Sequence, residues 1–329
     1  MNYRKFGETD LEVSEVGFGA WAIGGAAKVG DTAIGWGHTD EATSVKAITA
    51  ALDTGVNFFD TADFYGLGHS EDLLGKTLGE RNDVLIATKV GHRNIEEKIV
   101  LDYSKDYIIN ACESSLRRLN RDVIDYYQLH SARLPHLQEG GCIEAMEQLQ
   151  QQGKIRYWGL SLNTFYPQPE ADFLIGKGKG YGFQLVFNVI NQRAMETILR
   201  AAARGYGIIA RMPLQFGLLT GNFSSSATFE NTDHRSFRLT EDVLQSSLNM
   251  LQEKVWPAGE KEGLSETSLA LSYILSFPEI STVIPGIRTA EQVAANTSGI
   301  KHLTTETKAL LQGLAGEWEP IVQLMEQRG

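Results

Sequence analysis

The sequence contains few of the residues that mark disulfide-rich or fibrous proteins. It has only 2 cysteines, Cys112 and Cys142, and 8 prolines among 329 residues. Two cysteines are too few for a disulfide framework, and neither lies in the CxxC or CxxH spacing of redox and zinc sites. We therefore expect both thiols to pack within helices in a reducing compartment.

The chain also lacks a long apolar run. It has no stretch of about 18 apolar residues, and the N-terminal segment MNYRKFGETD has no signal-peptide core. The formal net charge of −11 disfavours a general surface for nucleic acid or anionic membranes. We expect a soluble, cytoplasmic protein that binds neither, with 42% hydrophobic residues available for a large core.

Strand-like and helix-like segments alternate along almost the whole chain. Eight short apolar segments are typical of buried parallel strands: residues 15–20, 56–60, 83–89, 123–130, 155–161, 183–187, 207–210 and 280–286. Helix-compatible sequence follows each of them. In the first such helix the predicted buried stripe is Ala42, Val45, Ile48, Ala51 and Leu52. Eight such units predict an α/β fold, a (β/α)8 TIM barrel, with residues 1–329 forming a single domain.

An open, doubly wound sheet is the alternative fold. It would carry GxGxxG or GxxxxGK[ST] after a strand, and neither motif occurs. Two features lie outside the repeat. Residues 3–13 predict an N-terminal β-hairpin that closes the bottom of the barrel. Residues 213–240 predict a long loop after strand seven, and a loop of this length is usually functional, for example as a lid. The tail after residue 301 is expected to pack across a barrel face.

Polar residues end three consecutive predicted strands, and the active site of a (β/α)8 barrel forms where the strands end. Asp60 ends the second strand, Lys89 the third and His130 the fourth, while Tyr65 lies in the loop after Asp60. Each alone has an ordinary structural explanation, such as helix capping, packing or snorkelling. Their joint occurrence favours a catalytic group.

These four side chains suit the reduction of a carbonyl, which needs a hydride at carbon and a proton at oxygen. A phenol ordinarily ionises near pH 10, so it can donate a proton at neutral pH but is a poor base in the reverse direction. The ammonium of Lys89 would favour the phenolate of Tyr65, and Asp60 would keep Lys89 charged. The imidazole of His130 would donate a hydrogen bond to the carbonyl oxygen.

In its motifs the chain resembles the aldo-keto reductase family. The resemblance spans nearly all of the chain and rests on GVNFFDTADFYG, LIATKVG, YYQLH, KIRYWGLS, PLQFGLLTG and IPGIRTAEQVAAN. It implies reduction of an aldehyde or ketone with NADPH, reversible as alcohol oxidation, with NADH also possible. It also implies that Asp60, Tyr65, Lys89 and His130 are catalytic, with Tyr65 as the general acid.

The resemblance further implies the cofactor contacts. Ser161 and Gln184 would hold the nicotinamide carboxamide; Leu162 stands where the family often has Asn, and Asn163 is the candidate to replace it. Arg211 stands where many members place an aromatic residue, and its planar guanidinium would stack on the nicotinamide. The contacts implied for the rest of the cofactor are Pro213, Leu214, Gly217, Arg235, Gly286, Arg288, Gln292 and Asn296.

The IPGIR segment bears on the choice of cofactor. Arg288, Gln292 and Asn296 are spaced to lie along one face of a helix that starts near Thr289. By the resemblance, Arg288 binds a 2′-phosphate through charge-assisted hydrogen bonds. Gly286 and Ile287 replace the Lys-Ser pair of many relatives, so NADH stays open as the cofactor.

Three further residues have local interpretations. Trp21 and Trp36, after the first strand, either line the substrate pocket or pack structurally. Ser70 precedes EDLLG and is expected to cap that helix.

A second class of function remains open: a nicotinamide-binding regulatory or channel-associated subunit with little turnover. The complete set of four polar residues favours the enzyme. A metal-dependent hydrolase would need several His, Asp or Glu ligands at strand ends, and HxH is absent after strand one, so no metal is expected. The substrate, beyond a small carbonyl compound, and the oligomeric state stay open because specificity in barrels lies in the loops.

Overall fold

Eight parallel strands form the centre of the computed structural model, which describes residues 1–35, 37, 39–79, 81–224, 226–229, 233 and 235–328. Their order is β14-β13-β12-β11-β10-β7-β6-β3. The strands are β3 (Phe18–Gly19), β6 (Phe58–Asp60), β7 (Leu85–Val90), β10 (Ile124–His130), β11 (Ile155–Ser161), β12 (Gly182–Val186), β13 (Gly207–Arg211) and β14 (Thr282–Ile284). All eight predicted strand segments are therefore confirmed.

The first and last strands meet and close the barrel. Parallel bridges join Val16 to Val283 and Gly19 to Gly286. The N–H of Gly19 donates to the carbonyl of Pro285 at 3.0 Å. A Cβ at Gly19 would lie 2.7 Å from that carbonyl oxygen, so the close approach of the two strands requires glycine. The predicted (β/α)8 barrel is confirmed.

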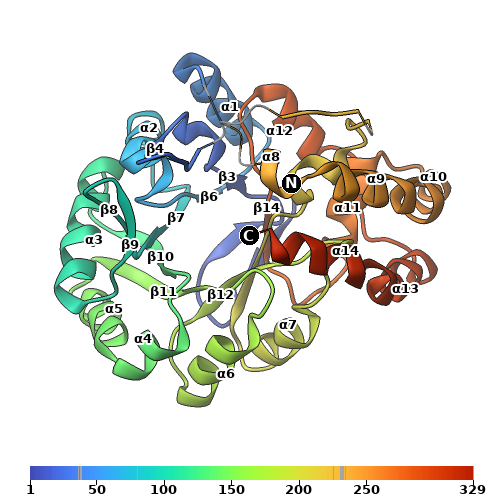
Figure 1. Cartoon of the computed structure of the whole chain (residues 1–329). Helices are drawn as coiled ribbons and strands as arrows, with labels where there is room; N and C mark the ends of the chain where they lie inside the picture. Colours follow the sequence, from blue (N-terminus) through green and yellow to red (C-terminus); the bar gives the residue numbers. More distant parts are fainter. Residues whose placement is uncertain are drawn as a thin grey trace.

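Helices form a ring around the barrel (Figure 1). One follows each strand: α1 (Glu41–Asp53), α2 (His69–Leu78), α3 (Lys105–Leu119), α5 (Gly141–Gln151), α6 (Gln168–Lys177), α7 (Met195–Ala202), α11 (Glu266–Leu275) and α12 (Ala290–Thr297). Cys112 and Cys142 are buried free thiols in α3 and α5, as predicted. Within the described ranges, no helix is both long and apolar enough to cross a membrane.

The buried face of α1 is rotated from the predicted stripe. Ala42 is exposed, whereas Ser44 and Ala47 are buried with Ile48 and Ala51. The prediction for Ala42 was wrong because it is in the first turn, where Asp40 caps the helix through the N–H of Thr43.

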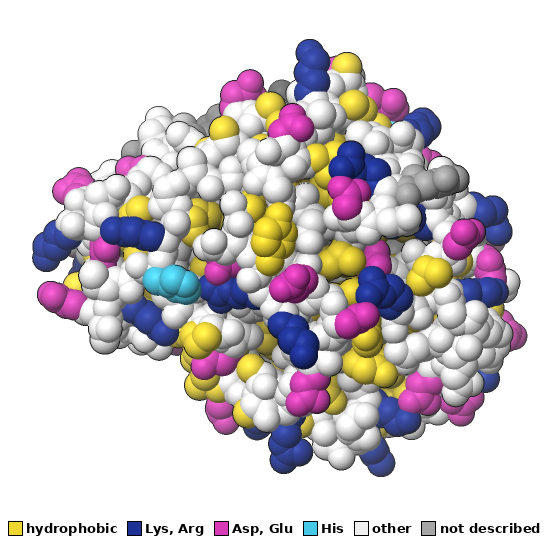
Figure 2. Space-filling view, turned by 180° about the vertical axis from the view of Figure 1, so that it is seen from behind, with side chains coloured by type: hydrophobic (Ala, Val, Ile, Leu, Met, Phe, Trp, Pro, Cys, Tyr) yellow, Lys and Arg dark blue, Asp and Glu magenta, His cyan; other side chains and the backbone are white. Residues whose placement is uncertain are grey.

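An N-terminal hairpin fills the bottom of the barrel, as predicted. Strands β1 (Tyr3–Lys5) and β2 (Glu12–Ser14) pair antiparallel, and they lie behind the barrel in Figure 1. Phe6 packs edge-on against Tyr126 with ring centroids 4.9 Å apart. Their buried cluster also contains Leu11, Val13, Phe58, Ala87, Ile209 and Ile284. Figure 2 shows this face of the molecule, with positive and negative side chains interspersed.

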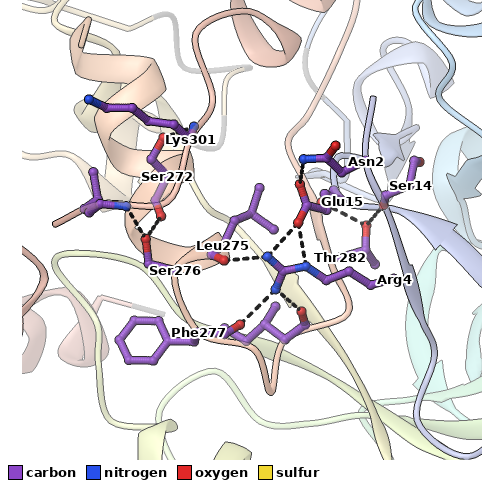
Figure 3. A network of polar contacts seen from close by, with 12 residues as sticks. Asn2, Arg4, Ser14, Glu15, Ser272, Leu275, Ser276, Phe277, Thr282 and Lys301 are labelled. Atoms are coloured by element: carbon purple, nitrogen blue, oxygen red, sulfur yellow. Dashed lines mark hydrogen bonds and ion pairs between the residues drawn. The ribbon is translucent and has the colours of Figure 1, made fainter. Parts of the chain in front are cut away.

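Arg4 ties this hairpin to the last strand and the helix before it (Figure 3). Its guanidinium donates to the carbonyls of Leu275, Phe277 and Ile280 at 2.6–2.9 Å. The same group forms an ion pair with Glu15 at 2.6 Å. The last four carbonyls of a helix have no hydrogen-bond partner within the helix. Arg4 supplies one to the carbonyl of Leu275, at the end of α11.

Several connections are longer than the repeat requires. Two small hairpins, β4 (Lys28–Val29) with β5 (Thr32–Ala33) and β8 (His92–Ile95) with β9 (Lys98–Leu101), follow β3 and β7 and were not predicted. The predicted loop after strand seven contains short helices η3 (Gln215–Thr220) and α8 (Arg235–Arg238). It continues into α9 (Glu241–Met250), η4 (Leu251–Val255) and α10 (Trp256–Glu262). The remaining short helices are η1 (Ala22–Gly24), η2 (Tyr65–Gly68) and α4 (Leu134–Glu139).

The C-terminal tail forms α13 (Thr305–Gly313) and α14 (Ala315–Gln327). Gln215, in the loop after β13, donates to the sulfur of Met325 in α14 at 3.1 Å. Gln192, after β12, donates to the carbonyl of Leu311 at 2.9 Å. The tail therefore packs against the loops at the carboxyl ends of the strands, where the predicted site lies (Figure 1).

Candidate active site

A buried lysine is the centre of the candidate site. Lys89, on β7, is fully buried, and its Nζ lies 2.6 Å from Oδ2 of Asp60 and 3.3 Å from Oη of Tyr65. It also donates to the carbonyl of Thr61 at 2.8 Å. Burial alone would lower the pKa of Lys89, but Asp60 and Tyr65 outweigh it and the pKa is raised. The lysine is thus held as an ammonium against a carboxylate and a phenol.

Two glutamines hold the other oxygen of Asp60. Oδ1 accepts from Nε2 of Gln128 at 3.1 Å and from Nε2 of Gln184 at 2.7 Å. Gln128 pairs in register with Lys89 across β10 and β7, and the sequence did not identify it. Gln184 was predicted to bind cofactor, yet here its amide nitrogen positions Asp60. Both carboxylate oxygens are therefore oriented by side chains from three other strands, β7, β10 and β12.

Tyr65 lies in the turn η2, directly after β6. Gly66 has φ 61°, and a Cβ there would lie 2.2 Å from the carbonyl oxygen of Gly24, so this turn packs tightly on η1. The ring of Trp21 stacks beside Tyr65 with centroids 6.0 Å apart. Trp21 thus lies at the candidate site, whereas the predicted pocket residue Trp36 lies outside the described residues.

Ser70 does not cap α2, and that prediction was wrong. Its hydroxyl is buried, accepts from Thr61 at 2.8 Å and donates to the carbonyl of Ala20 at 2.8 Å. Gly68 holds the N-cap position instead. Ser70 therefore ties the loop that carries Tyr65 to the end of β3.

His130 ends β10 and faces the same mouth. The centroid of its ring lies 5.9 Å from that of Tyr65, in an edge-to-face arrangement, and 4.3 Å from that of His92, with the two planes tilted. Burial lowers the pKa of His130 well below its usual value, and the nearby His92, Lys89 and Arg211 lower it further. The imidazole is therefore neutral at physiological pH and can donate a hydrogen bond from one nitrogen only.

The residues predicted around the nicotinamide lie at the ends of β11 to β13. Ser161 is buried and pairs in register with Gln184. Leu162 is buried in the apolar core. Oδ1 of Asn163 accepts from the backbone N–H groups of Phe165 and Tyr166, at 2.8 and 2.9 Å. Asn163 therefore uses its side-chain carbonyl to stabilise the turn after β11. Only its amide nitrogen is left to make the carboxamide contact that the family's Asn would make at position 162.

Arg211 ends β13 beside this group. Its Nη2 donates to Oγ1 of Thr164 at 2.9 Å and to the carbonyl of Leu162 at 3.3 Å. Its Nε is buried and has no partner among the described residues. Burial lowers the pKa of Arg211 to about 10. Arg211 forms no ion pair with any described residue, so its charge is left for a ligand.

The turn after β13 holds unusual backbone conformations. Met212, Gln215 and Phe216 have φ of 53°, 42° and 57°, in a region that L-residues rarely adopt. Buried Asn188 holds this turn, because its Nδ2 donates to the carbonyl of Met212 at 2.9 Å and to Oε1 of Gln215 at 2.8 Å. The turn contains the predicted cofactor residues Pro213, Leu214 and Gly217. Strained backbone of this kind clusters at ligand sites.

The other predicted cofactor residues lie in α8 and around α12. Arg235 forms an ion pair with Asp233 at 2.5 Å. The backbone N–H of Arg288 donates to Oε1 of Gln292 at 2.7 Å, so Gln292 orients the start of α12. Asn296 is buried, and Gly286 lies beside the first strand. The helix begins where predicted, with Thr289 as its N-cap.

Comparison with known proteins identifies the family. Residues 15–314 match the model of the aldo/keto reductase family. The chain belongs to this family. It is 31% identical over 320 residues to the uncharacterized oxidoreductase YqkF of Bacillus subtilis, with 95% of this chain and 96% of that protein covered. It superimposes on the holo form of the aldo-keto reductase AKR11C1 from Bacillus halodurans with a TM-score of 0.78, at 30% identity and 96% coverage of both chains.

Two other relatives differ in function from each other. The chain is 26% identical to an NADH-specific methylglyoxal reductase of Escherichia coli, with 93% of this chain and 95% of that protein covered. It is also 26% identical to a probable voltage-gated potassium channel subunit beta of Arabidopsis thaliana, with 100% and 98% covered. Relatives of similar length thus include both a reductase and a probable channel subunit, so the fold alone does not decide between these functions.

Aldo-keto reductases bind nicotinamide cofactors, and the residues at this mouth fit one. Buried polar atoms of Arg211, His130 and Gln128 lack partners among the described residues. Such atoms are costly unless a ligand or water satisfies them. In the described part of the chain, no group of three His, Cys, Asp or Glu side chains is arranged to hold a metal ion.

Proposed function

We propose that this protein reduces an aldehyde or ketone with NADPH, and oxidises the corresponding alcohol in reverse. The proposal rests on Lys89, because its buried ammonium contacts both the carboxylate of Asp60 and the phenol of Tyr65. In such a site the phenol is the natural proton donor, because the ammonium stabilises the phenolate left behind. Tyr65 is therefore the general acid.

The other residues of the group have distinct roles. Lys89 stabilises the phenolate, and Asp60, held by Gln128 and Gln184, keeps the lysine charged. His130 is neutral and donates a hydrogen bond to the carbonyl oxygen, which polarises the carbonyl. Together, the four groups deliver the phenol proton of Tyr65 to the carbonyl oxygen of the substrate.

When bound, the nicotinamide cofactor supplies the hydride to the carbonyl carbon. Ser161 and Gln184 would hold the nicotinamide carboxamide, and the planar guanidinium of Arg211 would stack on the nicotinamide ring. The turn with Pro213, Leu214 and Gly217 covers the pyrophosphate. Arg235, Gly286, Arg288, Gln292 and Asn296 take the adenosine end. Arg288 favours NADPH through its charge, while the NADH-specific relative makes NADH the alternative.

The competing proposal is a cofactor-binding regulatory subunit with little turnover, as the channel-subunit relative suggests. The complete Asp60, Tyr65, Lys89 and His130 group favours the enzyme, because binding a cofactor alone needs no proton donor.

A turnover screen separates the two proposals. NADPH and NADH are tested against short aldehydes, sugars and dicarbonyl compounds, with cofactor binding followed by fluorescence. We expect reduction of at least one class with NADPH. Tight NADPH binding with no turnover of any carbonyl would favour the regulatory subunit.

The Tyr65→Phe variant tests the general acid. It keeps the ring and removes the proton, so carbonyl reduction should fall by a factor on the order of 10² or more, as is usual for a lost general acid. NADPH affinity should stay unchanged and is the control for folding. Activity near that of the wild type would remove Tyr65 from the acid role.

A further inference from the structure

A second histidine lies against His130. His92 is the first residue of β8 and half-buried, with its ring centroid 4.3 Å from that of His130 and the two planes at 43°. The ring of Phe64, next to Tyr65, packs edge-on against His92 at 5.4 Å. His92 is thus between the loop that carries the general acid and the strand that carries the histidine.

The backbone of His92 is held in place by its hairpin. His92 pairs with Leu101 across β8 and β9, and Arg93 forms an ion pair with Asp102 at 2.5 Å. The hydroxyl of Tyr107, in α3, donates to the carbonyl of His92 at 3.4 Å. The position of the His92 backbone, from which the ring extends, is therefore set by the hairpin and by α3.

His130 lacks the usual means of orientation. A functional imidazole is commonly fixed by a hydrogen bond at its second nitrogen. Nδ1 of His130 is buried, yet no described residue forms a hydrogen bond with it. A buried N–H without an acceptor is rarer in proteins than a buried acceptor without a donor, so the proton belongs on Nε2. Among the described residues, ring packing is then what holds the imidazole.

We propose that His92 is a positioning residue of the carbonyl site, which holds the His130 ring by packing against it and covers one side of that ring against water. The proposal rests on the proposed function, in which His130 donates to the carbonyl oxygen. The face of the His92 ring does this work, and its nitrogens are not required. No described residue forms a hydrogen bond with a ring nitrogen of His92, in agreement with this role.

Two substitutions separate the ring from its nitrogens. His92→Ala removes the packing surface, while His92→Phe keeps it and removes both nitrogens. The first should lower the kcat for carbonyl reduction about tenfold or more, as misplacement of a reacting group does. The second should restore most of that loss. Ile95→Ala, an exposed change on the same strand, should leave kcat unchanged.

The protonation of His130 provides a readout that needs no turnover. Lys89 of β7, His92 of β8, Arg211 of β13 and the phenol of Tyr65 in η2 surround it, and burial keeps it neutral. NMR of the imidazole Cε1–H signal should show no titration near neutral pH in the wild type and in His92→Phe. In His92→Ala, more of the His130 ring is exposed to water, and the pKa of His130 should rise towards its ordinary value.

The outcomes are distinct. Unchanged kcat and unchanged titration in His92→Ala would overturn the proposal, and so would a loss in His92→Phe as large as that in His92→Ala. If the wild type reduces no carbonyl, the proposed function fails, while the titration still reports whether His92 shields His130.

Discussion

At the scale of single residues, the site depends on how one buried charge is shared. Lys89 donates to Asp60, to Tyr65 and to a backbone carbonyl, so its ammonium is fully satisfied without water. Removing one partner of a buried charge leaves the other uncompensated, which costs more than the pair contributes. A substitution in this group should therefore change the protonation of its neighbours as well as the stability of the fold.

Lys89→Met keeps most of the stem volume and removes the charge. Alcohol oxidation needs the phenolate of Tyr65, which the ammonium stabilises, so the pH profile for oxidation should move to higher pH. Steady-state rates across the pH range measure this shift. Asp60→Asn should have a milder effect, and the double variant should be strongly non-additive because the residues share one network.

NADPH binding is the control for the Lys89 variant, since a misfolded barrel would lose it. An unshifted oxidation profile in a Lys89→Met protein that still binds NADPH would make Lys89 a structural strand-end lysine.

Arg288→Ala tests the choice of cofactor. If the guanidinium contacts a 2′-phosphate, NADPH binding should weaken by about 1.5–3 kcal/mol, the range for hydrogen bonds to charged groups. NADH lacks that phosphate, so its binding should hardly change. Titration with both cofactors measures the difference. Equal losses would mean that Arg288 contacts the shared adenosine or supports the fold.

At the scale of elements, the N-terminal hairpin acts as a plug for the barrel. Phe6 is fully buried, and a Cβ at Gly207 or at Gly182 would lie 2.6 Å from its ring. Glycine at these two strand starts leaves the volume that the phenyl ring fills. The plug is at the opposite end of the strands from Lys89, so it contributes to stability and not to chemistry.

Phe6→Ala should therefore lower the free energy of unfolding by about 3–5 kcal/mol, as for other buried aromatic truncations. Urea denaturation measures the loss. Lys5→Ala, an exposed change one residue earlier, is the matched control and should have little effect. KM for cofactor should stay the same in both, and a stability loss in Phe6→Ala no larger than in the control would contradict the plug.

At the scale of the whole molecule, buried carboxyl groups behind the site make stability depend on pH. Glu71 is fully buried and accepts from Thr88 at 2.5 Å and from Arg118 at 2.7 Å. Oδ1 of Asp63 is buried with no partner among the described residues. Burial raises the pKa of Asp63 well above its ordinary value, and the charge of Glu71 raises it further.

The sign of the effect follows from proton binding. In the unfolded chain Asp63 ionises near pH 4, whereas in the folded protein it stays protonated to higher pH. The folded state then binds more protons, so the Asp63 contribution to stability is present below about pH 4 and is lost as pH rises through the folded pKa.

Asp63→Asn removes this titration with little change of shape. The unfolding free energy of the variant minus that of the wild type should increase with pH by up to about 1.4 kcal/mol per pH unit within the titration range. Urea denaturation from about pH 5 to about pH 8 measures the difference. A difference that stays constant over that range would show that Asp63 is charged throughout.

Much of the architecture could be predicted from the sequence because it depends on local pattern. The eight apolar segments and their helices give the strand count, and residues that end parallel strands meet at one edge of the sheet. Asp60, Lys89 and His130 could therefore be grouped before any contact was known. The hairpin at Phe6 was predictable for the same reason, from a short turn between extended segments.

The partners of these residues could not be predicted, because side-chain contacts across a barrel join distant parts of the chain. Gln128 and Gln184 reach Asp60 from 68 and 124 residues away. Asn188 and His92 carry no local signal either, since their roles come from a turn and a hairpin that pack against other strands.

By itself, then, the sequence determined the barrel, its family and the residues at its strand ends, because periodicity and chain order are local properties. Only the tertiary structure decided that Gln184 orients Asp60, that Ser70 ties loops together and that His92 packs against His130. Those contacts depend on the angle and register at which the strands close, which no short segment of the chain specifies.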